Sequence, residues 1–422
     1  MERYDRYKDS GVEWIGEIPE GWGISKLALF ARFHSGDALP ADKLLPYGDY
    51  PVYGGGDIKG YLNEYNITSG SVIVSRQGAT CGTCRYISTN AWATEHALVC
   101  FPITNIELRW LAYWLENMNL GQYSVSAAQP GISATLVESM SFPVFPREEQ
   151  KAIADYLDKK TSQIDSLIDK NEKSIELLEE YRKSIISEAV TKGLDPNAPM
   201  KDSGVEWIGE IPEGWVTRRL KNFLDSVPHS IVDGPFGSDL KSDEYTDTGV
   251  PVTQLNNIKE GFHRVDSFKF VSESKAAQLS SHFVFPGDLL MAKMMPAGRT
   301  CIASSAYPKY LLSSDSIRIV IDSSVDRRFV CYAANCYCLA ECELKSSGVT
   351  RIRINLSIVR NLSFVLPSLQ EQKKIADYLD QKTAEIDSLI DKKKQLIEKL
   401  QEYRKSLISE CVTGKIKVPG VE

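Results

Sequence analysis

The feature that most constrains this chain is a long segment that occurs twice. Residues 150–190, QKAIADYLDKKTSQIDSLIDKNEKSIELLEEYRKSIISEAV, return with few changes at residues 372–412. Neither residues 147–192 nor residues 368–413 contain proline or glycine, the two residues that most disfavour a helix interior, so each segment is predicted to form one helix. At 1.5 Å per residue each helix would be roughly 65 to 70 Å long, which is too long for a helix packed within one small domain.

The ends of the two predicted helices are marked in the sequence. Pro146 and Pro367 stand directly before them, and Gly193 and Gly414 stand where a left-handed residue would end a helix. At 422 residues the chain is also long enough for two separate cores. The expected division is a first globular region at 1–146, a long helix at 147–193, a second globular region at 194–367, a second long helix at 368–415 and a short tail at 416–422.

Apolar side chains recur along both helices at spacings of three and four residues, which is typical of a coiled-coil seam. The positions expected to pair are Ile164, Leu167, Asn171, Leu178, Tyr181 and Ile185 on the first helix, and Ile386, Leu389, Lys393, Leu396, Leu400, Tyr403 and Leu407 on the second. Two matching stripes in one chain favour antiparallel pairing about a pseudo-twofold axis, where Asn171 and Lys393 would meet and fix the register. The alternative is that each stripe packs on its own globular region.

A second repeat leads into each globular region. The segment KDSGVEWIGEIPEGW occupies residues 8–22 and returns unaltered at 201–215, whereas the regions that follow barely match each other. Short apolar runs such as SVIVS at 71–75 alternate with glycine, serine and asparagine, and each region also has one helical stretch. The sequence therefore predicts an α+β fold, with two mixed α/β regions separated by two long antiparallel helices in a pseudo-twofold tandem repeat.

The sequence lacks the motifs of common catalytic sites. It contains no Gly-x4-Gly-Lys-[Ser/Thr] phosphate loop, no Asn/Asp-Pro-Pro-aromatic methyltransferase motif, no Gly-x-Ser-x-Gly and no His-Glu-x-x-His. Cys81 and Cys84 have no second ligand pair at the spacing of a zinc site. Neither catalytic nor metal-binding residues are predicted.

The nine cysteines and the start of the chain indicate the cellular compartment. An odd number of cysteines without an apolar leader favours reduced thiols, so we expect a cytoplasmic protein. No stretch approaches the roughly 20 apolar residues that a membrane span needs. No membrane partner is therefore expected.

Polar and basic residues gather on predicted loops beside the strands of both globular regions. Arginine can bind guanine, and glutamine or asparagine can bind adenine, through paired hydrogen bonds in the major groove of DNA. The candidate DNA contacts are Tyr53, Arg76, Gln77, Thr80, Arg85, Gln129 and Ser133 in the first region, and Gln254, Asn256, Asn257, Lys293, Arg299, Thr350, Arg351 and Arg353 in the second. For each one, the alternative is a solvated loop tip or a hydrogen bond that braces the fold.

Two further observations bear on these loops. A shared Gly-x-Thr-Cys at 78–81 and 298–301 predicts that the two loops are equivalent. The net charge of −7 counts against binding of nucleic acid, because phosphate contacts depend on lysine and arginine. Residues 216–368, however, hold 18 basic and 15 acidic residues, so the second region is the more cationic.

Together these features resemble the specificity (S) subunit of type I restriction-modification systems. The motifs that carry the resemblance are GEIPEGW before each region, YPVYGGG and VPVTQLNNI at the region starts, SGSVIVSRQG and PGDLLMAKMMPAG within them, and PREEQKAIADYLD and PSLQEQKKIADYLD at the helix starts. The family implies two target-recognition domains, each of which reads one half of a split, asymmetric double-stranded DNA sequence. The helices of the family set the gap between the half-sites and dock two modification subunits.

The resemblance also implies that this chain is not an enzyme. Adenine methylation belongs to the modification (methyltransferase) subunits, and ATP-dependent translocation and cleavage belong to the restriction subunits. S-adenosylmethionine, ATP and Mg are therefore expected in partner subunits, with no cofactor in this chain. Two alternatives are a coiled-coil scaffold whose globular regions bind proteins, and an enzyme with an unrecognised site.

Overall fold

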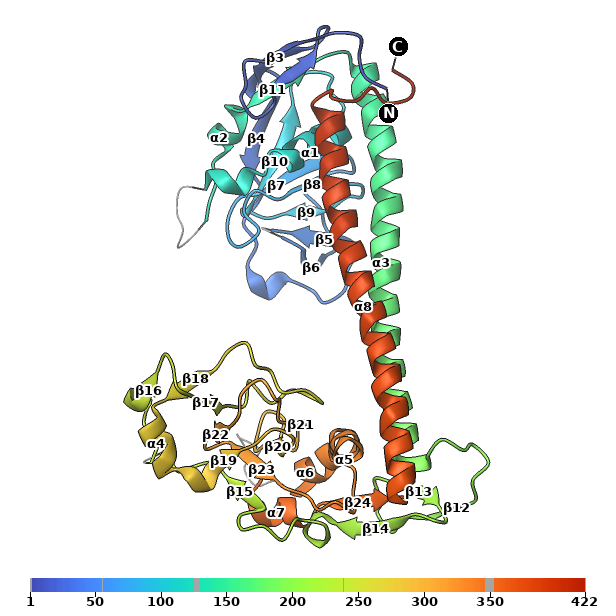
Figure 1. Cartoon of the computed structure of the whole chain (residues 1–422). Coiled ribbons are helices and arrows are strands. Elements are labelled where there is room, and N and C mark those ends of the chain that lie inside the picture. Colours follow the sequence, from blue (N-terminus) through green and yellow to red (C-terminus); the bar gives the residue numbers. More distant parts are fainter. Residues whose placement is uncertain (1, 55, 125–129, 238, 346–352, 422) are drawn as a thin grey trace. The chain divides into compact units, whose positions relative to one another are not determined.

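The computed structural model describes residues 2–54, 56–124, 130–237, 239–345 and 353–421 (Figure 1). The chain divides into two compact units, each combining one globular region with parts of the two long helices. Unit 1 consists of Met1–Lys173 and Lys393–Glu422, and unit 2 is Ser174–Lys392. Each unit has a large apolar core of its own.

The globular region of unit 1 is built on an antiparallel sheet in the order β4-β10-β7-β8. These strands are β4 (Ala31–Ser35), β10 (Ala97–Pro102), β7 (Ser71–Ser75) and β8 (Cys84–Ile87). Helix α1 (Leu108–Asn117) packs against β7 and β8 and buries Trp110 and Trp114 in the core. A second sheet has the order β6-β5-β9, formed by Ile58–Leu62, Tyr50–Tyr53 and Trp92–Ala93.

The globular region of unit 2 repeats the first sheet with the order β15-β23-β20-β21. These strands are β15 (Ile231–Asp233), β23 (Ser316–Ile319), β20 (Leu289–Ala292) and β21 (Thr300–Ile302). The second sheet is larger here, with the order β16-β18-β17-β22-β19, formed by Tyr245–Thr246, Lys269–Val271, Val250–Thr253, Tyr310–Leu312 and Phe283–Val284. Helix α5 (Arg327–Ala333) packs against β21 and continues through a π-helical turn into α6 (Leu339–Lys345).

The constant sequence blocks form the same small elements in both units. In unit 1, β1 (Tyr7–Asp9) pairs with β2 (Glu17–Pro19), and β3 (Gly23–Lys26) pairs with β11 (Ser141–Val144). In unit 2, β12 (Met200–Asp202) pairs with β13 (Glu210–Pro212), and β14 (Val216–Arg219) pairs with β24 (Ser363–Leu366). The short helices are α2 (Ala134–Glu138) in unit 1, and α4 (Glu273–Gln278) and α7 (Leu356–Arg360) in unit 2. The duplicated frame therefore has a duplicated structure.

The two long helices are α3 (Arg147–Lys192) and α8 (Leu369–Val412), and they lie side by side within each unit (Figure 1). In unit 1, Asp165 is 3.1 Å from Arg404, and Asn171 is 3.2 Å from Lys393. In unit 2, Arg182 lies 3.3 Å from Asp387. Because the partner number on α8 falls as the number on α3 rises, the helices are antiparallel, as the sequence predicted.

The seam between the helices differs from the predicted one at five positions. Leu167, Tyr181, Leu389, Leu396 and Tyr403 are between 45% and 54% exposed and lie outside the seam. The inner positions are Ile164, Ile168, Asn171, Ile175, Leu178, Arg182 and Ile185 on α3, and Ile386, Ile390, Lys393, Ile397, Leu400, Arg404 and Leu407 on α8. This strict four-three repeat admits only two seam positions in seven, so the five flanking residues face solvent.

The alternative packing also occurs, at the first turns of each helix. Ile153 and Leu157 of α3 are buried in the core of unit 1, and Ile375 and Leu379 of α8 are buried in the core of unit 2. Each helix therefore contacts the core of one unit at its start, and its last turns are buried in the core of the other unit.

We expect that replacing both Asn171 and Lys393 by leucine changes the specificity of helix pairing. Lys393 Nζ donates to Asn171 Oδ1 at 3.2 Å between aliphatic seam residues such as Ile168 and Ile390, and a polar contact at such a position favours one register. The double variant should melt at a higher temperature, since each buried leucine contributes about 1.5–3 kcal/mol, yet form more than one assembly in size-exclusion chromatography with light scattering. Exchange of Ile168 and Ile390 for leucine is the control. A single species with unchanged partner binding would refute the register role.

Candidate functional site

In unit 1, three loops meet at one edge of the main sheet. Strands β4 and β7 both run antiparallel to β10, so both end at the edge where β10 begins. Arg76 Nη1 there donates to Ser35 Oγ at 2.8 Å, and Gln77 Oε1 lies 3.2 Å from His96 Nδ1. Gln77, Thr80 and His96 line a pocket of about 390 Å³ at this edge. The structure therefore brings three of the predicted contacts together.

The remaining predicted contacts of unit 1 lie apart from this pocket or take part in the fold. Arg85 Nη2 is 2.5 Å from Asp57 Oδ1, and the half-buried Tyr53 packs on a small apolar cluster. Ser133 is the N-cap of α2, where its hydroxyl accepts from the Leu136 backbone N–H at 3.1 Å. Gln129 lies outside the described residues.

Unit 2 has the corresponding edge, because β15 and β20 both run antiparallel to β23. Lys293 Nζ donates to Asp233 Oδ2 at 2.8 Å, and Arg353 Nη2 donates to Asp315 Oδ1 at 2.6 Å. All four side chains line a pocket of about 470 Å³. Each of these two cations is therefore paired with a carboxylate of its own unit.

Backbone hydrogen bonds show which residues of the two edges are equivalent. The N–H of Arg76 donates to His96 O at 2.8 Å, and its carbonyl accepts from Ile132 N at 3.0 Å. Lys293 makes the matching bonds, to Asp315 O at 2.9 Å and from Ile354 N at 3.0 Å. Arg76 and Lys293 therefore occupy the same position in the two units.

The two loops are equivalent, as the Gly-x-Thr-Cys segments predicted, but these segments do not align with each other residue by residue. The N–H of Gly82 donates to Ser75 O, at the end of β7, and the N–H of Gly298 donates to Ala292 O, at the end of β20. Gly82 is thus the equivalent of Gly298. Gly78, counted from Arg76, corresponds to Met295.

In unit 2 the structure contradicts the prediction for Asn257. This side chain is fully buried, its Nδ2 donates to the carbonyls of Arg264 and Ser267, and its Oδ1 accepts from Gln254 N at 2.9 Å. An amide with its donors and acceptor satisfied inside the loop holds the fold and cannot reach a ligand. Asn256 beside it is exposed.

Of three other predicted residues of unit 2, the structure describes Arg299 alone. Arg299 is half-buried and donates through Nη2 to Leu255 O at 2.8 Å, and this burial lowers its pKa. Thr350 and Arg351 lie outside the described residues.

Sequence reasoning missed two apolar side chains at the edge of unit 2. Phe236, after β15, is 82% exposed, and Met295, after β20, is 70% exposed. Both line the same pocket as Lys293 and Arg353. The prediction considered only groups that form hydrogen bonds, whereas large exposed apolar side chains are also typical of binding sites.

A second missed feature joins each globular region to a long helix. In unit 1, Arg109 of α1 lies 2.7 Å from both Asp155 and Asp158 of α3 and 3.0 Å from Glu107. Burial alone would lower the pKa of Arg109, but the hydrogen bonds from these carboxylates outweigh burial and raise it. Tyr113 adds a hydrogen bond to Asp158 at 2.9 Å.

Unit 2 repeats this arrangement. Arg328 of α5 lies 2.8 Å from both Asp377 and Asp380 of α8, and Tyr332 donates to Asp380 at 2.8 Å. The chain therefore uses one arginine and two helix aspartates in each unit to orient the sheet edge relative to its helix.

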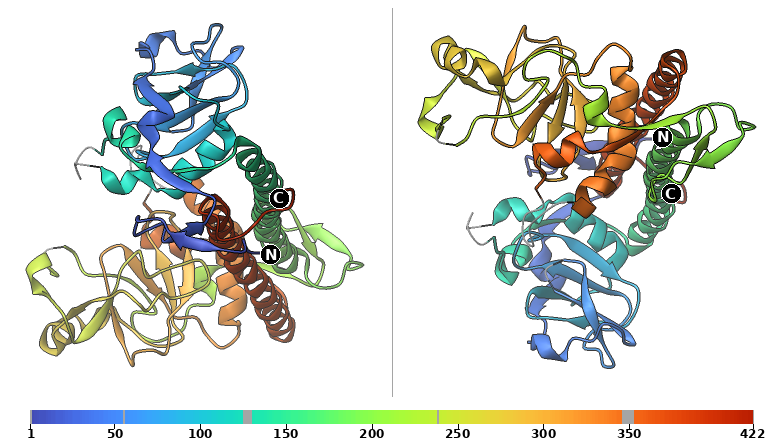
Figure 2. Two further views of the ribbon diagram at one scale, coloured as in Figure 1. Left: turned by 90° about the horizontal axis from the view of Figure 1, so that it is seen from above. Right: turned by 90° about the horizontal axis from the view of Figure 1, so that it is seen from below.

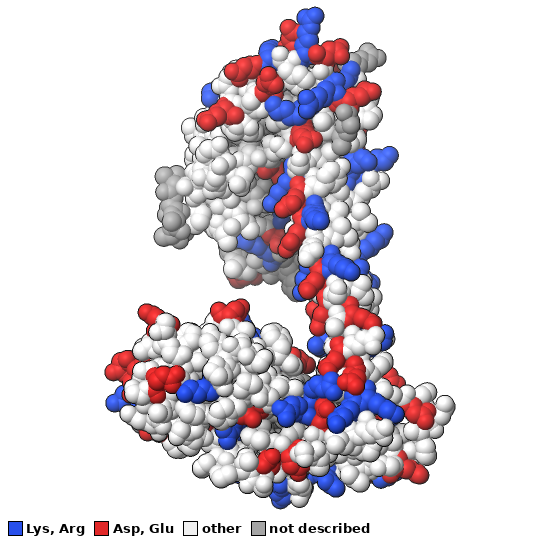
Figure 3. All heavy atoms as spheres, viewed as in Figure 1, with Lys and Arg blue, Asp and Glu red and all other residues white. Residues whose placement is uncertain are grey.

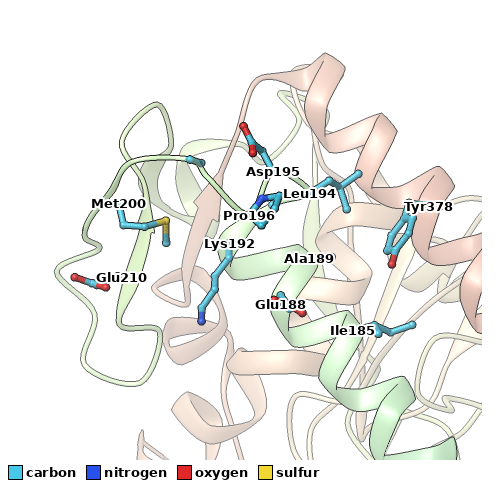
Figure 4. A pocket seen from close by; sticks show the side chains of 12 residues that line it. Ile185, Glu188, Ala189, Lys192, Leu194, Asp195, Pro196, Met200, Glu210 and Tyr378 are labelled. Atoms are coloured by element: carbon cyan, nitrogen blue, oxygen red, sulfur yellow. The ribbon is translucent and has the colours of Figure 1, made fainter.

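A pocket of about 580 Å³ lies in unit 2 at the end of α3 (Figure 4). Glu188 and Lys192 of α3, the exposed linker residue Leu194 and Tyr378 of α8 line it. In unit 1 the corresponding place holds both chain ends, which meet through a bridge between Glu2 and Lys417 and bury Val418 (Figure 2).

Thiols, metal sites and membrane segments can be assessed over the described part of the chain. All nine cysteines are free, and burial raises the pKa of Cys100 to about 12. Within the residues described, no group of three or more histidine, cysteine, aspartate or glutamate side chains could hold a metal ion. Over the same residues, no helix has the length and apolar character needed to cross a membrane.

Charged side chains of both signs are interspersed along α3 and α8, whereas the globular face of unit 1 seen in Figure 3 is largely uncharged.

Comparison with known proteins gives one consistent result. Residues 19–177 and 212–399 both match the family described as the type I restriction modification DNA specificity domain. The specificity subunit of the type I restriction enzyme MjaVIII from Methanocaldococcus jannaschii is 28% identical over 300 residues, which are 69% of this chain and 66% of that protein. The EcoprrI specificity subunit from Escherichia coli is 30% identical over 161 residues, 37% of this chain and 40% of that protein. The chain thus spans less than two thirds of either curated relative.

A solved structure has the same fold. It comes from work on the structural basis underlying complex assembly and conformational transition of the type I R-M system, and its chain superposes with a TM-score of 0.68 at 16% sequence identity. The superposition covers 94% of this chain and 98% of that chain, so the likeness extends over both units and both long helices.

Proposed function

This chain belongs to the type I restriction-modification DNA specificity family, and on that premise we propose that its two globular regions are target-recognition domains. Each domain reads one half of a bipartite, asymmetric sequence in double-stranded DNA. The observation that carries this proposal is the pair of equivalent sheet edges, where one backbone register presents Arg76, Gln77 and His96 in unit 1 but Lys293, Phe236 and Met295 in unit 2. Equal frames with unlike side chains suit two different base sequences.

The repeated segments of the chain have separate roles. Residues 1–146 and 194–367 are the two recognition domains, residues 147–193 and 368–415 are the helices that set the distance between the half-sites, and 416–422 is the tail. Lys293 and Arg353 are paired with aspartates, so partner subunits supply much of the phosphate contact. Because the partner subunits contact much of the DNA phosphate, a net charge of −7 on this chain is compatible with DNA binding.

The half-exposed residues beside the helix seam form the docking surface for two modification subunits. Unit 1 presents Leu167 and Tyr403, and unit 2 presents Leu389 and Tyr181, which are the same positions in the repeat. Two equivalent apolar faces suit two copies of one partner. S-adenosylmethionine, ATP and Mg act in the modification and restriction subunits, and the assembled complex works in the cytoplasm.

We expect Gln77→Ala to weaken binding to one half-site by about 10- to 100-fold, because a paired amide–base contact contributes about 1–3 kcal/mol of discrimination. The measurement is the Kd of the complex with modification subunits for duplexes altered in one half-site at a time. Arg6→Ala, a change at an exposed surface pair of the same unit, is the control and should have no effect. Equal loss on every sequence would instead make Gln77 a phosphate contact. A complex that binds no duplex at all would favour the protein-binding scaffold.

A further inference from the structure

Two large apolar side chains project at the sheet edge of unit 2 described above. Phe236 and Met295 are 82% and 70% exposed, and they come from loops that follow the parallel strands β15 and β20. Both line the pocket of about 470 Å³ between these loops. Exposed apolar groups gathered in one pocket are typical of a binding surface rather than of a solvated loop.

The charges around this pocket are balanced within the domain. Lys293 Nζ lies 2.8 Å from Asp233 Oδ2, and Arg353 Nη2 lies 2.6 Å from Asp315 Oδ1. A phosphate group would have to displace a carboxylate from either cation, and an amino group would have to displace a cation from either carboxylate. The group that meets Phe236 and Met295 is therefore expected to be uncharged and apolar.

The positions of unit 1 that are equivalent to Phe236 and Met295 hold smaller residues. The N–H of Gly36 donates to Ala97 O and the N–H of Gly234 donates to Ser316 O, both at 3.0 Å, so these glycines are equivalent. Counting from them, Ala38 stands where unit 2 has Phe236. Gly78 stands where unit 2 has Met295 when both are counted from Arg76 and Lys293.

The backbone at Met295 gives an independent indication that its side chain is used. Gly78 has φ +87° and Met295 has φ +56°, so both lie in the left-handed region. Glycine adopts this conformation freely, whereas a methionine there is strained. Strained residues of this kind cluster at ligand-binding sites, where the side chain has a task that glycine cannot perform.

We propose that Phe236 and Met295 recognise the 5-methyl group of thymine in the major groove. Among the four bases only thymine presents a methyl group there, and it is read by apolar side chains such as phenylalanine. Unit 1, with Ala38 and Gly78, reads its half-site through polar groups such as Gln77. The inference rests on the proposed DNA-reading function and adds the chemical group that one domain selects.

The test replaces each thymine of the recognised sequence, one at a time and in both half-sites, by deoxyuridine, which lacks only the methyl group. The Kd is measured for the chain in complex with its modification subunits. For the unaltered chain we expect about fourfold weaker binding at one or more thymines, the effect of one buried methyl group, and all of these positions should fall within one half-site. Phe236→Ala and Met295→Gly should remove this sensitivity at the same positions.

The two variants install the residues of unit 1 at equivalent positions, and Met295→Gly also relieves the strained backbone, so both are expected to fold. Retained binding to the other half-site, with an unchanged circular dichroism spectrum, confirms that they do. If the unaltered complex binds its sequence specifically but deoxyuridine weakens binding in neither half-site, the thymine inference is wrong and the proposed function stands. Equal uridine sensitivity in the two variants and in the unaltered chain would also overturn it. Absence of any half-site discrimination by the unaltered complex would overturn the proposed function itself.

Discussion

Arg109→Ala should weaken recognition of one half-site at least about tenfold and destabilise unit 1 by about 2–3 kcal/mol. Its guanidinium is less than a third exposed and lies 2.7 Å from both Asp155 and Asp158, with Glu107 at 3.0 Å. Removal of the cation leaves three carboxylates facing one another, which costs several kcal/mol in a fully buried site and less here because the two aspartates are partly solvated. Helix α1 would then lose its fixed orientation on α3. The main sheet of unit 1, on which α1 packs, would no longer be held in one orientation relative to α3.

The repeat supplies the reciprocal experiment. Arg328→Ala removes the equivalent cation, which lies 2.8 Å from Asp377 and Asp380 in unit 2, and it should affect the other half-site only. Thermal unfolding and half-site Kd values measured for both variants form one matched set. A loss shared equally between the half-sites in either variant would show that these arginines do not act within single units.

The stability of unit 2 should fall by up to about 3 kcal/mol between pH 7 and pH 4 because of His263. This side chain is buried against Phe268 and Tyr310, with ring centroids 5.6 Å and 4.8 Å away. Its Nδ1 accepts from Ser304 N at 3.3 Å, which requires the neutral ring, and burial lowers its pKa from 6.5 to about 4.

The direction of the pH effect follows from this depressed pKa. As the pH falls below 6.5, the unfolded chain binds a proton that the folded chain accepts only near pH 4, so stability present above pH 6.5 is lost in this window. His263→Asn keeps an acceptor for Ser304 N but does not titrate. Denaturant unfolding of both proteins across this range should give a difference that grows as the pH falls, and parallel curves would contradict the assignment.

The helices and the frame could be predicted from the sequence because their causes are local or repeated. Uninterrupted runs without proline and glycine specify α3 and α8, and the duplicated blocks specify two copies of each small sheet. The residues of the seam were predicted less accurately. Leu167 and Tyr181 fit a loose three-four pattern, but they lie beside the strict repeat, which contains Ile168 and Ile175.

The two sheet edges depend on contacts between distant parts of the chain, which local patterns do not reveal. Lys293 is paired with Asp233, sixty residues away, and the burial of Asn257 follows from the carbonyls of Arg264 and Ser267. The short Gly-x-Thr-Cys match identified the equivalent loops but not their register, because strand pairing sets the register of a loop. Phe236 and Met295 could not be predicted as site residues, because the sequence does not show that these apolar loop side chains remain exposed.

Mapping of methylated adenines across the genome, in cells with and without this gene, measures whether this chain selects the DNA sequence that is methylated. We predict that loss of the gene removes methylation at one sequence made of two unlike half-sites with a fixed gap. Substitutions at the sheet edge of one unit should change one half-site alone. An unchanged set of methylated adenines in cells that express the partner subunits would contradict this prediction.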